Sequence, residues 1–253
     1  MIAEKGGRLC RTIVSRCATT AHATTAGSAR ATRPTRSRER SRPRSARSSG
    51  RRSRSRAPAA PTRASTRAQV ASFRAKTDLP PEEILRALRE ALPKDIGALS
   101  LAEAAPRFHA RLNCRGKTYV YRIWNSEAPD VFERRWRVAV PQPLDPAAMQ
   151  TAAAALCGTH DYTSFCSNRR MKKSAVRTVE SIDVQRDGDE VRLVFTGDGF
   201  LYHMVRILSG TLLEVGLGER GADTMAEILD AKNRDAAGKT APAKGLILWE
   251  AFY

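Results

Sequence analysis

The sequence predicts an α+β fold in which helices flank an antiparallel sheet. Residues 179–184 and 190–196 are strand candidates, and the turn Arg186-Asp187-Gly188-Asp189 between them is a strong hairpin signal. Four other segments have the apolar spacing or the end signals of helices, and the elements do not follow one another in regular β-α-β order. An antiparallel sheet with helices packed against it accounts for both observations.

The first elements of the fold lie between residues 69 and 93. Residues 69–73, Gln-Val-Ala-Ser-Phe, form a short β-rich run. Pro80-Pro81, followed by two glutamates, starts a helix, and Pro93 ends it. The apolar residues of this helix fall on one stripe, at Ile84, Leu85, Leu88 and Leu92.

Residues 111–124 alternate as a strand does. One face carries Tyr119, Tyr121 and Ile123, and Arg122 belongs to the other face. We expect this strand to pair with a neighbour across the core.

Three helices are predicted in the remainder of the chain. Asp145-Pro146 reads as the N-cap and first residue of an Ala-rich helix that ends at Gly158. Residues 200–215 have helical spacing and stop at Gly216, and a further helix covers residues 224–232.

Charge is distributed very unevenly along the chain of 253 residues, whose formal net charge is +18. Residues 1–67 hold 18 of the 44 Lys and Arg but only two of the 26 acidic residues, so residues 68–253 hold 26 basic and 24 acidic residues. Strong positive charge favours a nucleic-acid or anionic-membrane partner. Because the later part is nearly neutral, the net charge is no argument that this part binds RNA.

The cysteines indicate neither a disulfide framework nor a zinc site, because they are odd in number and lack Cys-x-x-Cys spacing. They are Cys10, Cys17, Cys114, Cys157 and Cys166. No run approaches the roughly 18 apolar residues of a membrane span, and residues 1–15 lack a secretion signal. We therefore expect a soluble, cytoplasmic protein with no membrane or metal partner.

The sequence divides at residue 67. From about Arg16 to Arg67 the chain consists almost entirely of Ala, Arg, Ser, Thr and Pro, and such a segment buries too little apolar surface to offset its ordering entropy. We expect residues 1–67 to be disordered. Three origins compete: an Arg/Ser arm that binds RNA, a transit peptide, and translation in the wrong reading frame.

Residues 68–253 carry four motifs that together indicate a family. They are Phe108-His109-Ala110-Arg111 through Lys117-Thr118-Tyr119-Val120-Tyr121-Arg122, Gly158-Thr159-His160-Asp161-Tyr162-Thr163-Ser164-Phe165, Asp198-Gly199-Phe200-Leu201-Tyr202-His203-Met204-Val205-Arg206, and Thr240-Ala241-Pro242-Ala243 with Gly245-Leu246. In order and spacing they resemble the tRNA pseudouridine synthase A family. Each motif is weak alone, but four in the correct order form a strong signal.

The resemblance implies a fold of two related α+β halves, of which the first is largely lost in this chain. It also implies a homodimer that binds tRNA, with no metal or organic cofactor. Such enzymes convert uridine to pseudouridine in the anticodon stem-loop, and the reaction needs a carboxylate that acts on the nucleotide. In the family this is the Asp of Gly-Arg-Thr-Asp-Ala-Gly. That motif is absent from the chain as written.

Back-translation favours the wrong-frame explanation for the low-complexity segment. With G/C-rich codons that start one base early, residues 57–67 permit Gly-Ala-Gly-Arg-Thr-Asp-Ala-Gly-Val-His-Ala. In the same frame, residues 19–30 permit Tyr-Asp-Gly-Ala-Arg-Tyr-His-Gly-Trp-Gln-Arg-Gln. Both resemble family motifs. We therefore predict a frameshift, with the original frame resuming near Ala68 and Pro61, Thr62 and Arg63 standing where the Asp should be.

Two site residues follow from the resemblance. It places Tyr119 where an aromatic ring stacks on the target uracil, although spacing alone also fits a tyrosine that fills the core. Arg206 matches the basic residue that pairs with the catalytic Asp. No catalytic residue can be identified in the chain as written.

A basic run follows the Ser164-Phe165 turn, and we expect it to contact tRNA phosphates, although a solvated charged loop fits each residue equally well. It consists of Arg169, Arg170, Lys172, Lys173 and Arg177. The histidines His109, His160 and His203 are too far apart in sequence to suggest a metal site.

Overall fold

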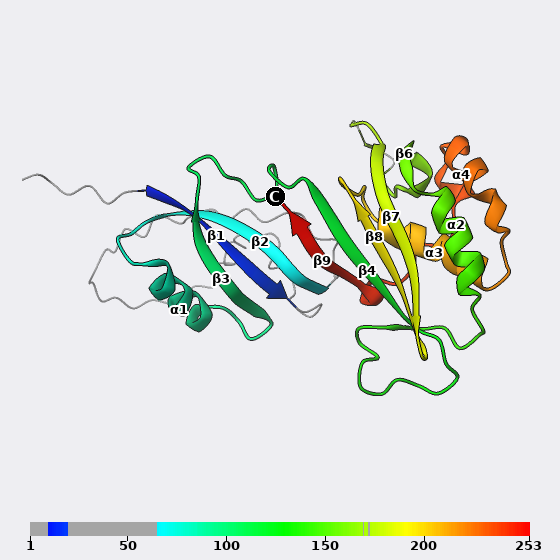
Figure 1. The fold of residues 1–253 in the computed structure, drawn as a ribbon, viewed down its shortest axis with the longest axis horizontal. Helices are drawn as coiled ribbons and strands as arrows, with labels where there is room; N and C mark the ends of the chain where they lie inside the picture. The colour runs from blue at the N-terminus through cyan, green and yellow to red at the C-terminus, as the bar shows by residue number, and fades with distance from the viewer. Residues whose placement is uncertain (1–9, 20–64, 169, 172) are drawn as a thin grey trace, which may run out of the picture.

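The computed structural model describes residues 10–19, 65–168, 170–171 and 173–253. These residues form one nine-stranded sheet with helices packed against it (Figure 1). The strands are β1 (Cys10–Thr19), β2 (Ser65–Lys76), β3 (Ile96–Ala104), β4 (Gly116–Trp124), β5 (Val138–Ala139), β6 (Gly158–Asp161), β7 (Val176–Asp187), β8 (Glu190–Gly197) and β9 (Leu246–Phe252). The α-helices are α1 (Pro81–Ala91), α2 (Pro146–Ala155), α3 (Met204–Gly216) and α4 (Met225–Ala231). The predicted α+β class is confirmed.

The strands lie in the order β3-β1-β2-β9-β4-β8-β7-β6, and β5 pairs with the end of β4. Most neighbours are antiparallel, as predicted, and the hairpin between β7 and β8 is present. Two pairs are parallel: β2 with β9, and β4 with β5. The sheet is therefore mixed. β9 joins its two parts, because β9 pairs with β4 on one side and β2 on the other.

Helices α2, α3 and α4 gather at the end of the sheet that contains β6, β7 and β8 (Figure 1). The carboxylate of Asp145 accepts hydrogen bonds from the backbone N–H groups of Ala147 and Ala148, so it caps α2 as the sequence predicts. α2 packs on β7 and α3. Helix α3 is the most buried of these helices, with ten buried residues.

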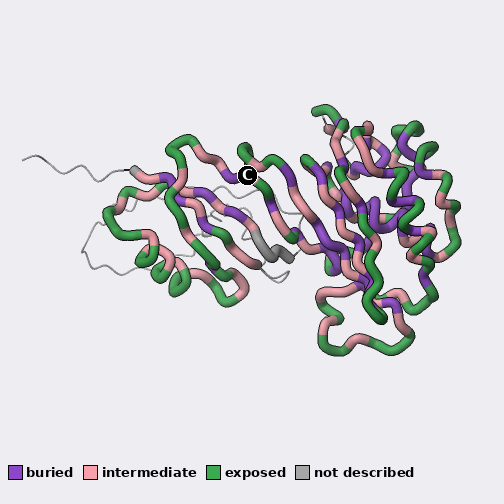
Figure 2. The backbone as a smooth tube through the Cα atoms, viewed as in Figure 1, coloured by how far each residue is buried: buried purple, intermediate pink, exposed green. Residues whose placement is uncertain are grey.

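The main core lies between these helices and the sheet, and its members come only from residues 119–248. Figure 2 shows the same contrast, with buried residues concentrated around β4, β8 and α3. Helix α1 has no buried residue, and its Arg89 donates to the carbonyl oxygens of Ala98 and Leu99 in β3. In the described part of the chain, β1, β2 and β3 therefore have a thinner apolar cover than β4 and β8.

Strand β1 contradicts one expectation. Residues 10–19 belong to the segment expected to be disordered, but they pair with β2 and β3, and Ile13 is buried. The expectation is wrong for these residues and for residues 65–67, which belong to β2. Residues 1–9 and 20–64 of that segment lie outside the described residues.

Three element boundaries also differ from the sequence prediction. The strand expected from residue 111 begins at Gly116, because residues 111–113 form a turn. The helix expected from residue 200 begins at Met204, after a loop whose Leu201 is buried. The Ala-rich helix ends at Ala155, and the residues after Cys157 form β6.

Candidate functional site

Arg206, in the second half of the first turn of α3, is fixed by a loop from the end of the chain. Its Nε donates a 2.7 Å hydrogen bond to the carbonyl oxygen of Ala241, and the Ala241 N–H donates to the Arg206 carbonyl oxygen at 3.0 Å. The side chain is half-buried. Among the described residues, no carboxylate lies within ion-pair distance of it. The guanidinium is therefore held in place by neutral groups and retains its capacity for an anion.

Tyr121 reaches the same loop from the sheet. Its hydroxyl donates a 2.8 Å hydrogen bond to the carbonyl oxygen of Pro242. Burial raises the pKa of Tyr121, and nearby Arg206 opposes that rise. Tyr121 and Arg206 thus converge on two consecutive backbone carbonyls, those of Ala241 and Pro242.

The loop before Ala241 is tied to α3 by side chains of that helix. The Gly238 N–H donates to Thr211 Oγ1 at 3.0 Å, and the Lys239 N–H donates to Glu214 Oε1 at 2.9 Å. Glu214 in turn accepts two hydrogen bonds from Arg220. The Thr-Ala-Pro motif is therefore positioned by α3, the same helix that carries Arg206.

Tyr119 lies two residues before Tyr121 on the same face of β4. Its side chain is 4% exposed, and its ring meets Phe200 edge-on, with the centroids 5.3 Å apart. Burial raises the pKa of Tyr119, so its hydroxyl remains protonated. The structure thus joins two of the sequence motifs at Tyr119, but it holds this ring in the core.

The turn at Asp198 brings the third motif against the start of β7. The Thr178 N–H donates to the Asp198 carboxylate at 3.1 Å, and the Asp198 N–H donates to the Thr178 carbonyl oxygen at 3.0 Å. Arg177 lies beside Gly199, since a Cβ on that glycine would lie 3.7 Å from the Arg177 Cδ. One residue of the basic run is therefore next to the loop that leads into α3.

The other members of the basic run are less closely connected to this loop. Arg170 and Lys173 are exposed, while Arg169 and Lys172 lie outside the described residues. The Ser167 N–H, which precedes the run, donates a 3.2 Å hydrogen bond to the Tyr202 carbonyl oxygen. The loop with the basic run and the loop before α3 are thus in direct contact.

Sequence reasoning missed two residues of this site. Tyr202 is 53% exposed, and its ring stacks on that of His203, with centroids 3.9 Å apart and planes 25° from parallel. His203 has a left-handed backbone, with φ of 62°. The helical spacing from Phe200 onward concealed both, because it predicted a helix where the chain forms a loop.

The carboxylates of Asp161 and Glu190 already have hydrogen-bond partners within the protein. The carboxylate of Asp161 accepts hydrogen bonds from the Thr163 hydroxyl and N–H, and the hydroxyl bond is the main cause of its lowered pKa. Glu190 is 5% exposed in its side chain and accepts hydrogen bonds from Arg122 and Arg192. Burial tends to raise the pKa of Glu190, but these arginines and Arg137 together lower it to about 2. Both carboxylates therefore stabilise the fold.

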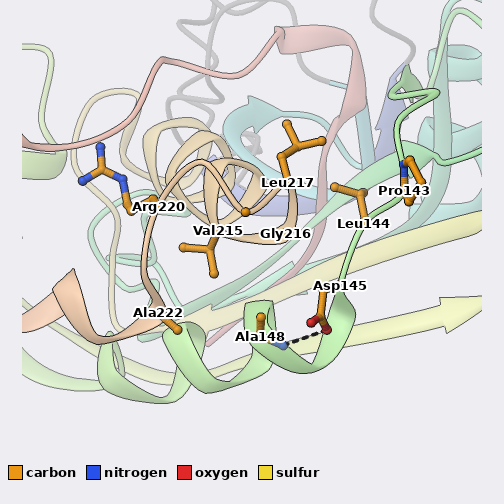
Figure 3. A pocket seen from close by; sticks show the side chains of 10 residues that line it. Pro143, Leu144, Asp145, Ala148, Val215, Gly216, Leu217, Arg220 and Ala222 are labelled. Carbon is orange, nitrogen blue, oxygen red and sulfur yellow. Dashed lines mark hydrogen bonds between the residues drawn. The ribbon is translucent and has the colours of Figure 1, made fainter.

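A separate cavity of about 460 Å³ lies between the start of α2 and the end of α3 (Figure 3). Leu144, Ala148, Val215 and Leu217 contribute to its wall. None of the site residues predicted from the sequence lines it. The cavity therefore gives no support to a ligand site at the four sequence motifs.

Within the described ranges, no three His, Cys, Asp or Glu side chains are grouped closely enough to bind a metal ion. No helix in that part of the chain is long and apolar enough to cross a bilayer.

Comparison with known proteins identifies the family. The sequence model of the tRNA pseudouridine synthase family matches residues 152–253. The tRNA pseudouridine synthase A of Halalkalibacterium halodurans is 46% identical over 179 residues, which cover 71% of this chain and 68% of that protein. The enzyme of the same name from Brevibacillus brevis is 46% identical over 185 residues, 73% of this chain and 76% of that protein. The enzyme of the same name from Acetivibrio thermocellus is 41% identical over 185 residues, which cover 73% of this chain and 76% of that protein. At this identity and coverage, the chain belongs to the tRNA pseudouridine synthase A family.

Proposed function

We propose that residues 68–253 form the tRNA-binding and base-holding part of a tRNA pseudouridine synthase, an isomerase that converts uridines of the anticodon stem-loop to pseudouridine. The chain as written does not catalyse this reaction, because its nucleophilic Asp is absent. Family membership supports the reaction class, and the relatives align over about the length of residues 68–253.

The observation that carries this proposal is the state of Arg206. Its Nε is bound to a backbone carbonyl, and no described carboxylate neutralises its charge. A half-buried guanidinium without an anionic partner is costly unless a negative group is brought to it. In the active enzyme this group is the Asp of the Gly-Arg-Thr-Asp motif, held by the charge and the planar geometry of Arg206.

The position of β2 supports the same assignment. Ser65 and Thr66 of β2 pair with Ile247 and Leu248 of β9, and Leu248 pairs with Tyr119 of β4. The Asp of the shifted reading corresponds to position 62, three residues before Ser65 in sequence. Position 62 lies outside the described residues, but β2 enters the sheet beside β9, which follows the Pro242 loop and pairs with β4 on its other side.

In the reaction, the Asp carboxylate acts as nucleophile or base on the target nucleotide and the N-glycosidic bond breaks. Carbon C5 of the same uracil then bonds to the ribose and loses its proton, while the released N1 gains one. The ring of Tyr119 holds the detached uracil by stacking, which requires the ring to leave its buried position against Phe200. The basic run, Arg169, Arg170, Lys172, Lys173 and Arg177, contacts tRNA phosphates. The active enzyme is a cytoplasmic homodimer and needs no cofactor.

Restoring the reading frame tests the proposal. Replacing residues 19–67 by the shifted translation reintroduces Gly-Arg-Thr-Asp. We expect the restored protein, and not the chain as written, to form pseudouridine in unmodified tRNA. A folded, restored protein that forms none would refute the assignment, and an active chain as written would refute its inactivity.

A second function is favoured by the charge of residues 1–67, which carry 18 basic and two acidic residues. If this segment is a genuine arm, the protein binds RNA without catalysis. Mass spectrometry of the natural protein separates the two: peptides from the Arg/Ser-rich segment identify the arm, and peptides with Gly-Arg-Thr-Asp identify the enzyme.

A further inference from the structure

The loop before α3 presents two aromatic rings to solvent from a rigid base. Leu201 and Met204, on either side of them, are 8% and 0% exposed. The Met204 N–H donates to the Leu201 carbonyl oxygen at 3.1 Å, and Met204 Sδ accepts from the Leu201 N–H at 3.4 Å. Because both flanking residues are anchored in the core, Tyr202 and His203 project outward from a short, fixed segment.

The two rings stack face to face. Their centroids are 3.9 Å apart and their planes differ by 25°. His203 covers one face of Tyr202, yet Tyr202 remains 53% exposed. Within the described chain, the Tyr202 hydroxyl makes no hydrogen bond, so polar bonding gives no reason for a tyrosine at this place.

The backbone that creates this arrangement is strained. His203 has a φ of 62°, a left-handed conformation that costs free energy for a residue with a Cβ. His203 is the residue directly before α3, and it lies about one helical turn from Arg206. Burial, and then the charge of Arg206, lower the pKa of His203, so its imidazole is uncharged at neutral pH and stacks as a neutral ring.

Cationic residues lie in the two segments that contact this loop. Arg177 lies beside Gly199 at the start of the loop, and Ser167, at the start of the segment with Arg170 and Lys173, is bound to the Tyr202 carbonyl oxygen. An exposed aromatic plane among cationic side chains is how proteins bind unpaired bases, because the cations bind phosphates while the ring stacks on the base.

We propose that the free face of Tyr202 is a stacking platform for an unpaired RNA base, with His203 as its backing ring. The base is one beside the target uridine, since Arg206 marks the reaction centre one turn further along α3. Stacking tolerates any base, so Tyr202 contributes affinity and position rather than sequence choice. This inference rests on the proposed function.

The test measures binding of the full chain to two labelled oligomers by fluorescence anisotropy. One is oligouridylate, and the other is an abasic ribose-phosphate oligomer of the same length, which has the same charge but no base to stack. We expect Tyr202→Leu to weaken binding of oligouridylate by roughly 5- to 100-fold and to leave the abasic oligomer within about twofold, because phosphate contacts are unchanged. Tyr202→Phe, which keeps the ring, should bind as the parent does.

Phe132→Leu is the matched control, because Phe132 is an aromatic residue 91% exposed in the loop after β4 and belongs to no part of the site. Its affinity for both oligomers should not change. As a second measurement, Tyr202→Trp should add a fluorescence signal that oligouridylate quenches and the abasic oligomer does not.

Three outcomes overturn the inference. Equal losses on both oligomers would show a structural or electrostatic effect, and an unchanged affinity in Tyr202→Leu would show that no base stacks there. Either result leaves the proposed function intact. Failure of the parent chain to bind oligouridylate would overturn the inference alone, because the proposed function is tested separately by pseudouridine formation in tRNA.

Discussion

Gly210 of α3 lies directly against the carbonyl oxygen of Lys239. A Cβ added to this glycine would be 1.8 Å from that oxygen, a distance no side chain can adopt. The close approach lets the loop of residues 238–242 lie on α3, where it receives Arg206 and Tyr121. The glycine therefore determines the position of the site loop without contacting either of those side chains.

Gly210→Ala should destabilise the protein by roughly 3 kcal/mol, because the backbone of Lys239 cannot yield as a flexible side chain would. Urea denaturation followed by circular dichroism measures this change. Gly97→Ala is the matched control, since no atom lies within 4 Å of a Cβ there. Equal stability of the two variants would show that the loop moves away from α3 at little cost.

Glu190→Gln should destabilise the protein by about 2 kcal/mol at pH 7, because Arg122 and Arg137 lose a buried carboxylate and keep only the more exposed Glu133 as a shared partner. The pKa of Glu190 in the folded protein is about 2, below its ordinary value. The ion network therefore contributes stability above roughly pH 4.3, the unfolded pKa, and this contribution is lost as the pH falls toward 2.

Denaturation at a series of pH values measures this dependence: the gap between parent and Glu190→Gln should narrow in acid. Asp187→Asn is the control, because Asp187 meets Arg192 at 3.6 Å on the surface and is 79% exposed. It should change stability by less than about 0.5 kcal/mol. A gap that stays constant with pH would contradict the assigned role of Glu190.

Gln150 of α2 completes the hydrogen bonding of β7 beyond the end of β6. Its amide nitrogen donates to the Ile182 carbonyl oxygen at 3.1 Å, and its amide oxygen accepts from the Val184 N–H at 2.7 Å. Gln150→Ala should cost about 1–2 kcal/mol, since two backbone groups lose a partner. Gln150→Glu retains the acceptor alone and should cost less in thermal unfolding. A larger loss in Gln150→Glu than in Gln150→Ala would contradict the bridging role.

Arg206→Lys should lower pseudouridine formation by roughly 100-fold in the protein with the restored frame, because an ammonium group cannot bond the Ala241 carbonyl and orient a carboxylate with one planar group. Its unfolding free energy should fall by only about 1 kcal/mol, the value of one hydrogen bond. Arg186→Lys, near the end of β7, should change neither quantity. Equal activity of Arg206→Lys and the restored parent would exclude the planar contact.

Local signals predicted the parts of the fold that depend on neighbours in sequence. The Pro81 and Pro146 helix starts and the turn at Gly188 are correct, because capping groups and turn residues act within a few residues. The start of α3 was wrong because Leu201 is buried from a loop, where its spacing imitates a helix. The parallel pairing of β2 with β9 depends on residues far apart in sequence and leaves no local pattern.

The candidate site also has parts that the sequence predicts and parts that it does not. The four motifs predict Tyr119 and Arg206 as site residues, but the partners of Arg206 and Tyr121 are backbone carbonyls, which any residue supplies and no sequence pattern reveals. Tyr202 was missed because its exposure depends on the left-handed backbone of His203. Which residue stands at position 62 is decided by the coding sequence and not by folding.

The place of β9 between β2 and β4 sets the order in which the protein can assemble. A ribosome synthesises β1, β2 and β3 early, but the strand that links them to the main core is made last among the described strands. The contacts that close the sheet therefore span most of the chain, and such distant contacts slow folding. Until β9 emerges, one side of β2 and one side of β4 present unpaired backbone to other nascent chains, so this protein should depend on chaperones during its synthesis.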